Sequence, residues 1–470
     1  MENFNKNIFR AYDIRGIYPN ELNEKTAYLI TKAFLKMFPN AKNIAVGGDF
    51  RLSTPLIKKT IIEALAKEGK KVFDVADGPT PVFRFALVKN NCDHGIIITA
   101  SHNPKEYNGL KIMDKNAYDY TGETIIYKLY EIAKKIIDGT ASTVNTSKQT
   151  NSINSTDIIN TTKIDMTEEY IKYLTAKIKL KKPLKIILDT GNGACHEIPE
   201  RIFKKLGCEV KTLFKEPDGN FPNHLADPHK EENLKTLQKE VLNEKANLGI
   251  AYDGDGDRIG IIDNQGRIIS GFNILIMLAR QALNKKKGNI VFEIRAADAL
   301  IKDTENHGGK VFISKAGHSY VLEEIIKQNA IFGGEMTGHL YFPYCYHNFD
   351  DGIFAGLKIA EIASEYDKFS DYFDSLPKIF ISKETVINIP DDIKFQKIEE
   401  LKEYFKKEKY DVNDLDGIKI NFKNGSALIR ASNTAPQIKI IFEGKKEEDK
   451  VKIGEELQKI LQKFEINYLE

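Results

Sequence analysis

The stretch Gly95–Pro104 reads GIIITASHNP and joins an apolar run to a group of polar side chains. Gly95–Ile98 has the length and character of a buried strand. The loop that follows carries a serine, a histidine and an asparagine side by side and is closed by Pro104. Serine and asparagine before proline are typical of a turn. The alternative interpretation is a loop that holds Ser101 out to react.

Helical and strand-like patterns alternate around this stretch and through most of the chain. Apolar residues recur at helical spacing in Glu21–Phe38 and Thr54–Glu68, while Asn43–Val46 and Lys71–Val75 are short strand-like runs. This alternation predicts an α/β fold with a buried, mostly parallel sheet. Near the C-terminus, Asn424-Gly425 predicts a hairpin turn, so the tail is expected to be a small antiparallel α+β domain.

The length of 470 residues is too great for one core, and two to four domains are expected. We predict three α/β domains, with mixed sheets between helices, and a smaller C-terminal α+β domain. The segment 139–162 is rich in Ser, Thr and Asn and has no periodicity, so it is predicted to be a linker. The predicted domains span residues 1–162, 163–267, 268–379 and 380–470.

The composition argues against several classes of function. The chain has 69 basic and 67 acidic residues, a net charge of +2, and hence no surplus for a nucleic-acid-binding face. Four cysteines without a CxxC pair suit a reducing compartment. The first residues hold no apolar core of signal-peptide length, and the most apolar helical stretch, Phe272–Leu283, is too short to span a bilayer. We expect a cytoplasmic protein with no nucleic-acid or membrane partner.

A second polar loop, Asp253–Arg258, reads DGDGDR and follows the apolar run Leu248–Tyr252. Its two glycines let the backbone fold tightly, so that three carboxylates face one point. Three oxygen donors with an open position suit a hard cation such as Mg²⁺, with a phosphate oxygen completing the shell. An EF-hand is excluded by spacing, since Arg258 and Asn264 occupy its glycine and glutamate positions.

Ser101 is the candidate nucleophile, and a free serine hydroxyl must be activated. Lys111 follows a turn after the Ser101 loop and is placed to return to it. His102 is a candidate source of a proton or a hydrogen bond. Arg15, near the N-terminus, is a candidate for stabilising phosphoryl charge in the transition state.

Two further loops combine turn residues with polar side chains. Gly334–His339 reads GEMTGH and sets Glu335 and Thr337 at alternating positions, where both can point at sugar hydroxyls. The nearby sequence KAGHS supplies His318 as a candidate of the same kind. Arg430–Pro436 reads RASNTAP and offers a guanidinium, two hydroxyls and an amide in a turn, which suits a phosphate cradle.

Taken together, these loops resemble the α-D-phosphohexomutase family, in its phosphomannomutase/phosphoglucomutase branch. TASHNP is similar to the family's phosphoserine loop, DGDGDR to its metal loop, GEMTGH to its sugar loop and RASNTAP to its phosphate loop. FRAYDIRG, residues 9–16, and PDGNFPNHLADP, residues 217–228, are also similar to family segments, and all six occur in the family's order. The sequence departs from the pattern at Thr337 for serine, at Arg295 for lysine, and in GGDFR, which lacks a first arginine.

The resemblance implies four domains around a central cleft and an enzyme that interconverts hexose 1-phosphate and hexose 6-phosphate, of mannose, glucose or both. It implies a phosphoryl group on Ser101 and a hexose 1,6-bisphosphate that is both intermediate and activator. One Mg²⁺ per chain would be held by Asp253, Asp255, Asp257 and phosphorylated Ser101. The implied catalytic residues are Ser101, Lys111, Arg15, Arg258 and His102. The implied substrate-binding residues are Tyr12, Arg295, His318, Glu335, Thr337, His339, Arg430, Ser432, Asn433 and Thr434. The expected partners are hexose phosphates, and the expected assembly is a monomer or weak dimer.

Three alternatives stay open at this point. A mutase of the same family could act on phosphoglucosamine, although Met336 in the sugar loop argues mildly against it. The run Ile250–Asp255 also mimics the nucleophile strand of haloacid-dehalogenase phosphatases, in which Asp253 would take the phosphoryl group. A non-catalytic phosphosugar-binding protein would have lost the nucleophile or a metal ligand, and here Ser101 and all three aspartates are present.

Overall fold

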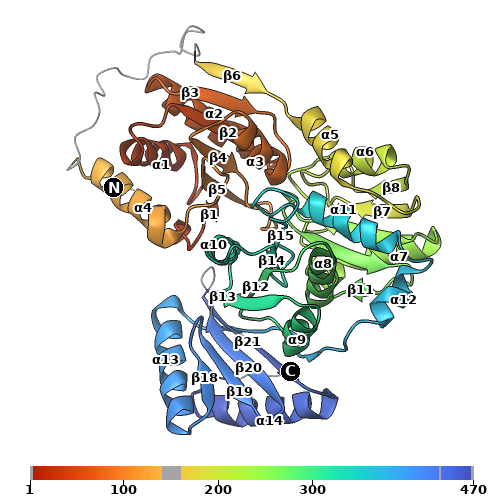
Figure 1. Cartoon of the computed structure of the whole chain (residues 1–470). Helices are drawn as coiled ribbons and strands as arrows, with labels where there is room; N and C mark the ends of the chain where they lie inside the picture. Colours follow the sequence, from red (N-terminus) through yellow and green to blue (C-terminus); the bar gives the residue numbers. More distant parts are fainter. Residues whose placement is uncertain (1–3, 140–159, 433–435, 467–470) are drawn as a thin grey trace. The chain divides into compact units, whose positions relative to one another are not determined.

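The computed structural model describes residues 4–139, 160–432 and 436–466 (Figure 1). The chain divides into two compact units. Unit 1 contains Met1–Ser270, Thr337–Phe342 and Tyr346–Tyr372, and unit 2 contains Gly271–Met336, Pro343–Cys345 and Phe373–Glu470. In each unit, helices pack against the faces of sheets.

The first sheet of unit 1 has the strand order β1-β5-β4-β2-β3-β6. Its members β4, β2, β3 and β6 are parallel, while β5 pairs antiparallel with both β4 and β1. The strands are β1 (Ile14–Ile17), β2 (Asn43–Gly48), β3 (Lys71–Val75), β4 (His94–Ile98), β5 (Tyr107–Asp114) and β6 (Thr161–Ile164). The helices around it are η1 (Lys6–Ile8), α1 (Glu24–Met37), α2 (Thr54–Lys67), α3 (Thr80–Lys89), η2 (Gly122–Ile126) and α4 (Tyr127–Ile137).

Successive side chains of the central strands point to opposite faces of this sheet, and different helices cover the two faces. Ile44 and Val46 of β2 belong to the same buried cluster as apolar residues of α1, α2 and α4. On the opposite face, α3 approaches so closely that a Cβ at Gly47 would lie 2.5 Å from the Phe83 ring. Both faces of β4 are therefore covered, which is why the run before Ser101 is apolar throughout.

The second sheet of unit 1 has the order β11-β10-β9-β7-β8 and is also mixed. Parallel pairing joins β7 to β8 and β9, and β10 returns antiparallel to β9. Helices α7 and α11 both contact β9 and β10. Its strands and the helices near it are α5 (Thr167–Lys177), β7 (Lys185–Asp189), α6 (Ile198–Lys205), β8 (Glu209–Leu213), α7 (Glu231–Asn243), β9 (Leu248–Tyr252), β10 (Ile259–Asp263), β11 (Ile268–Ile269) and α11 (Gly352–Ala363). Unit 1 also contains α12 (Phe369–Asp374) and the short strand β15 (Leu340–Tyr341), which is not part of this sheet.

Unit 2 contains one parallel arrangement and one antiparallel sheet. Strand β12 (Asn289–Glu293) pairs parallel with β13 (Lys310–Ser314) and β14 (Phe332–Gly334), near α8 (Gly271–Lys285), α9 (Asp298–Asn306) and α10 (His318–Gln328). The C-terminal sheet pairs β21 with β16, β17 and β20, then β20 with β19 and β19 with β18, all antiparallel. Its elements are β16 (Phe380–Ile381), β17 (Thr385–Asn388), α13 (Asp391–Lys407), β18 (Asp411–Asn413), β19 (Ile418–Phe422), β20 (Gly425–Ala431), β21 (Gln437–Gly444) and α14 (Glu447–Gln462).

The predicted fold class is confirmed: three α/β/α domains precede a C-terminal domain with an antiparallel sheet. The predicted linker 139–162 differs in one respect, because Thr161 and Thr162 belong to β6, which pairs with β3 at the edge of the first sheet. Most of that linker, residues 140–159, lies outside the described part. Among the described residues, none of the helices combines the length and the apolar character needed to cross a membrane.

Candidate active site

The candidate nucleophile Ser101 lies just beyond β4, and only 3% of its surface is exposed. Its Oγ donates a hydrogen bond of 2.6 Å to Asp253 Oδ2, and its backbone N–H donates to Thr99 Oγ1 at 2.9 Å. Its φ of 49° lies in the left-handed region, which costs a non-glycine residue roughly 1 kcal/mol. Such a conformation persists only where surrounding contacts impose it, and it often marks a functional position.

The loop that connects β9 to β10 supplies three carboxylates to the same place. Asp253, Asp255 and Asp257 are 0%, 0% and 1% exposed, and one oxygen of each lies within 4.8 Å of the others. Gly254 permits the close approach to the nucleophile loop, because a Cβ there would lie 2.4 Å from the carbonyl oxygen of Ser101. Two loops from different sheets of unit 1 therefore meet at one point.

The electrostatics of these carboxylates favour a bound cation. Burial raises the pKa of Asp253 well above its ordinary value, and the charge of Asp257 adds to this effect. The Oδ1 atoms of Asp255 and Asp257 are buried and have no hydrogen-bond partner. Buried carboxylate oxygens that accept no hydrogen bond suit a hard divalent cation as ligands. This donor set therefore fits a metal site.

Lys111, on β5, compensates two of these charges. Its Nζ lies 2.7 Å from Asp255 Oδ2 and 2.6 Å from Asp257 Oδ2. Burial alone would lower the pKa of Lys111, but the two carboxylates outweigh burial and raise it. The lysine therefore stays charged at pH 7.

Arg258 and His102 flank the serine hydroxyl. Arg258 donates from Nη2 to Ser101 Oγ at 2.8 Å and from Nε to Asp253 Oδ2 at 3.0 Å. His102 Nδ1 lies 3.2 Å from Ser101 Oγ and also contacts Arg258 Nη2. Burial, reinforced by the Arg258 charge, holds the pKa of His102 well below its usual range. The imidazole beside Ser101 is therefore neutral at pH 7.

Arg15 is brought to the nucleophile loop by strand pairing, since β1 sets it opposite Gly109 of β5. Its Nη1 donates to Asn103 Oδ1 at 2.6 Å and to the Ala100 carbonyl at 3.3 Å. Tyr12 precedes β1 in the same segment and is partly exposed. The N-terminal signature and the TASHNP loop are thus adjacent in space.

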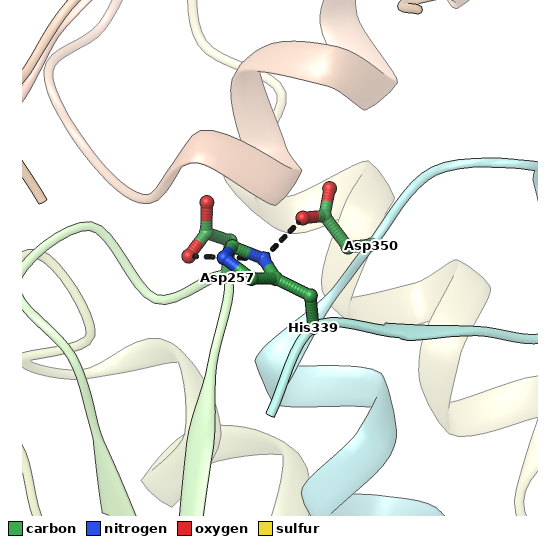
Figure 2. A group of neighbouring side chains, drawn as sticks. All are labelled: Asp257, His339 and Asp350. Carbon is green, nitrogen blue, oxygen red and sulfur yellow. Dashed lines mark hydrogen bonds and ion pairs between the residues drawn. The ribbon is translucent and has the colours of Figure 1, made fainter. Parts of the chain in front are cut away.

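His339 of the sugar loop lies between two carboxylates, as Figure 2 shows. Its Nδ1 is 2.6 Å from Asp350 Oδ2 and 3.8 Å from Asp257 Oδ1. Burial opposes the charged form, but the two carboxylates raise the pKa of His339. Asp350 in turn forms an ion pair with Arg84, whose Nη2 lies 3.2 Å from Asp350 Oδ1. Thr337, two residues before His339, is partly exposed.

Unit 2 brings together a second set of predicted residues. Glu335 follows β14, and its Oε1 accepts from the backbone N–H of Gly317 at 2.5 Å, next to His318 at the start of α10. Arg430 of β20 pairs with Asp416 at 3.3 Å. The same aspartate accepts a backbone N–H of the KAGHS loop at 3.0 Å. The KAGHS loop thus contacts both the sugar loop and a carboxylate that binds Arg430.

Arg295 and Ser432 are the other predicted residues that unit 2 encloses. Arg295 lies 2.7 Å from Glu293 Oε1 and 3.4 Å from Glu384 Oε1, so two carboxylates already bind its guanidinium. Ser432 is 3% exposed. Outside the described residues lie two more predicted side chains, Asn433 and Thr434.

Sequence reasoning missed several groups that hold this site. Asp350 pairs directly with His339, and Arg84 pairs with Asp350. Thr80 Oγ1 donates a hydrogen bond to Asp255 Oδ2 at 2.7 Å. Arg51, in the GGDFR segment, contacts the nucleophile loop. Their roles depend on pairing between distant segments, which no local pattern encodes.

The fold and site define a class of protein: a multidomain α/β enzyme with a buried serine beside an acidic loop whose three carboxylates could hold a metal ion. Residues 6–139, 168–266 and 270–380 match the models of phosphoglucomutase/phosphomannomutase alpha/beta/alpha domains I, II and III, and residues 387–459 match that of the C-terminal domain.

Individual relatives agree with the family models. The chain is 37% identical over 440 residues to a phosphomannomutase/phosphoglucomutase of Pseudomonas syringae pv. tomato, covering 93% of this chain and 91% of that protein. It is 36% identical over 448 residues to a phosphoglucomutase of Neisseria gonorrhoeae, covering 94% of each. The crystal structure of a phosphoglucomutase/phosphomannomutase family protein from Burkholderia thailandensis is similar with a TM-score of 0.87, at 31% identity and 98% coverage of both chains.

The chain therefore belongs to the phosphoglucomutase/phosphomannomutase family. It is an isomerase of sugar metabolism. The resemblance seen in six loops of the sequence is confirmed. The predicted domain boundaries and the roles of individual site residues stay predictions.

Proposed function

We propose that the protein interconverts hexose 1-phosphate and hexose 6-phosphate, of glucose, mannose or both, by passing a phosphoryl group through Ser101. The observation that carries this proposal is the buried Ser101 Oγ, 2.6 Å from Asp253 Oδ2 in the acidic loop. A serine that gives its phosphoryl group to one end of the sugar and regains one from the other end passes through a hexose 1,6-bisphosphate. The same bisphosphate would act as activator by phosphorylating Ser101.

Asp253, Asp255 and Asp257 are the residues that would hold one Mg²⁺, with an oxygen on Ser101 as a further ligand. Support comes from the donor set itself, three buried carboxylates of which two oxygens lack partners. When bound, Mg²⁺ supplies charge neutralisation for the transferring phosphoryl group.

The chain's own cations support the same transfer. Arg258 Nη2 lies 2.8 Å from Ser101 Oγ, so a phosphoryl group on that oxygen would be within reach of its guanidinium. Lys111 fixes Asp255 and Asp257, and Arg15 binds the backbone of the nucleophile loop. Neutral His102, 3.2 Å from the hydroxyl, is placed to exchange a hydrogen bond with it.

Substrate recognition is assigned to the sugar and phosphate loops. Glu335 and Thr337 would bind ring hydroxyls, and the RASNTAP loop would hold the phosphate that is not reacting. A bisphosphate that presents each phosphate to Ser101 in turn requires such recognition in both orientations. The residues assigned to substrate binding are Tyr12, Arg295, His318, Glu335, Thr337, His339, Arg430, Ser432, Asn433 and Thr434.

The test measures turnover of glucose 1-phosphate, mannose 1-phosphate and glucosamine 1-phosphate with Mg²⁺ and a trace of glucose 1,6-bisphosphate. Ser101→Ala is expected to lower kcat by at least about 10³-fold. Ser364→Ala, which removes another buried hydroxyl remote from the acidic loop, is the matched control and should keep kcat. Full activity of Ser101→Ala would contradict the proposal, and faster turnover of the glucosamine ester would assign the sugar to the phosphoglucosamine alternative.

A further inference from the structure

The guanidinium of Arg51 binds three backbone carbonyls of the nucleophile loop and one at the start of β5. Nη2 donates to the carbonyls of Ser101 at 2.8 Å and Asn103 at 2.6 Å. Nη1 donates to the carbonyls of Pro104 at 2.8 Å and Tyr107 at 3.0 Å. Arg51 is 1% exposed, so these bonds form in a water-excluded setting. One side chain therefore binds three of the six backbone carbonyls of the TASHNP loop, which presents the candidate nucleophile.

This arrangement needs the planar, multiply donating head group of arginine. Two nitrogens each serve two acceptors, which the compact ammonium of a lysine cannot reproduce in the same geometry. Asp49 fixes the head group from behind, with its Oδ2 at 3.3 Å from Arg51 Nε. Asp49 Oδ1 also accepts from Thr54 Oγ1 at 2.8 Å, so the aspartate itself is fixed.

A segment of the second α/β domain packs on the other side of Arg51. The Phe221 ring centroid lies 5.1 Å from the Arg51 guanidinium carbon, within the range of a cation–π contact. Gly219 makes the approach possible, since a Cβ there would lie 2.7 Å from both Phe50 O and Leu52 N. Gly219 and Phe221 belong to PDGNFPNHLADP, a motif to which the proposed reaction assigns no chemical role.

We infer that Arg51 is a positioning residue that keeps Ser101 in its left-handed conformation, and that Phe221 supports it from the second domain. Arg51 contacts carbonyls of the nucleophile loop and of Tyr107, the Asp49 carboxylate and the Phe221 ring, none of which is a group assigned to sugar binding. The expected signature is thus a lower kcat with little change in KM. The inference rests on the proposed phosphoserine role and adds a device that aims the nucleophile.

The experiment compares Arg51→Lys with the wild-type enzyme and with Arg280→Lys, a control arginine that pairs with Asp303 on α9. It measures kcat, KM for glucose 1-phosphate, and the rate at which glucose 1,6-bisphosphate phosphorylates Ser101. For Arg51→Lys we expect kcat and the phosphorylation rate to fall at least about tenfold, as expected for loss of more than one buried charged hydrogen bond. KM should stay within about twofold, and the control should match the wild type.

Phe221 provides a second, milder test that does not depend on whether Arg51→Lys folds. Phe221→Leu should lower kcat about threefold, whereas Phe221→Tyr keeps the aromatic face and should keep kcat. Equal kcat in Phe221→Leu and Phe221→Tyr, or an unchanged phosphorylation rate in a folded Arg51→Lys, would overturn the inference. Absence of phosphate on Ser101 of the wild type would instead overturn the proposed function, so the two failures are distinguishable.

Discussion

The loop after β4 and the loop after β20 both follow buried strands, but they are held in different ways. Ser101 is bound by Asp253 and Arg258 of the DGDGDR loop and by Arg51 of the GGDFR segment, so two separate segments supply the three side chains. At the end of β20, Arg430 pairs with Asp416 across 3.3 Å. Ser432, the last described residue there, donates its N–H to Gln437 O at 2.8 Å, and its carbonyl oxygen accepts from Lys394 Nζ at 2.6 Å. The comparison teaches that buried charged side chains, joined by hydrogen bonds and ion pairs, hold the proposed phosphoryl-transfer region in place before substrate binds. Among the described residues of the proposed phosphate-binding region, the contacts are one ion pair, one hydrogen bond from a lysine to a backbone carbonyl, and the pairing of β20 with β21.

The largest effect is expected from breaking the acidic cluster of the first region. Asp255→Asn removes a candidate metal ligand and a partner of Lys111, so kcat should fall by at least about 10³-fold. Mg²⁺ at about 100 times its Kd should stabilise the wild type by about 2.7 kcal/mol, and the variant should lose that gain. Urea unfolding with and without Mg²⁺ measures the difference.

The matched control comes from β12 of unit 2. Glu293→Gln alters a buried carboxylate that is paired with Arg295 but lies in unit 2. It should keep the Mg²⁺-dependent stabilisation in full. If Mg²⁺ raised the free energy of unfolding equally in Asp255→Asn and in the wild type, the DGDGDR loop would not be the metal site.

A smaller effect is expected from Asp351, a buried carboxylate of unit 1 that accepts hydrogen bonds from Tyr170 and Tyr346 at 2.7 Å each. Burial raises its pKa from 3.8 to about 6. The folded state therefore binds the proton more tightly than the unfolded state, and stability falls as pH rises from about 4 to about 6. Above that range the cost levels at about 3 kcal/mol.

Asp351→Asn removes this titration. The free energy of unfolding of the variant minus that of the wild type should grow by up to about 3 kcal/mol between pH 4 and pH 7. Urea titrations across that range measure it. A difference that stays constant, or that shrinks as pH rises, would show that the charged form of Asp351 costs the folded state no stability.

The smallest effect is expected in the second region. Arg430→Ala removes the guanidinium proposed to bind the non-reacting phosphate, and KM for glucose 1-phosphate should rise about tenfold, the cost of one charged hydrogen bond. Arg280→Ala removes a paired arginine elsewhere in the same unit and should leave KM unchanged. Steady-state kinetics measure KM. An unchanged KM in Arg430→Ala would contradict the assignment of phosphate binding to this loop.

The sequence predicted the parts of the site that local patterns encode. Ser101 and the three aspartates stand directly after apolar runs, and in α/β sheets ligand-binding loops follow the carboxyl ends of strands. Lys111 was found because a turn returns the chain to the same sheet. The fold class followed from the alternation of helical and strand-like patterns, and the family from six loops in order.

Other features depended on pairings that a single sequence does not display. Arg84 and Asp350 are far apart in sequence and meet beside His339, whose predicted role was sugar binding. Arg295 was predicted to bind substrate, and the structure pairs it with two carboxylates. The motif PDGNFPNHLADP was identified by its resemblance to a family segment, but the sequence alone assigned it no physical role. The contact of its Phe221 with Arg51 suggests such a role.

The most direct test of the central claim is to locate the phosphate. The wild type, Ser101→Ala and Asp253→Asn are incubated with glucose 1,6-bisphosphate and Mg²⁺, and intact mass and peptide mapping follow. The account predicts one acid-stable phosphate on the peptide that contains Ser101 of the wild type, and none on Ser101→Ala. A hydroxylamine-sensitive phosphate on Asp253, or a phosphate that persists in Ser101→Ala, would contradict it.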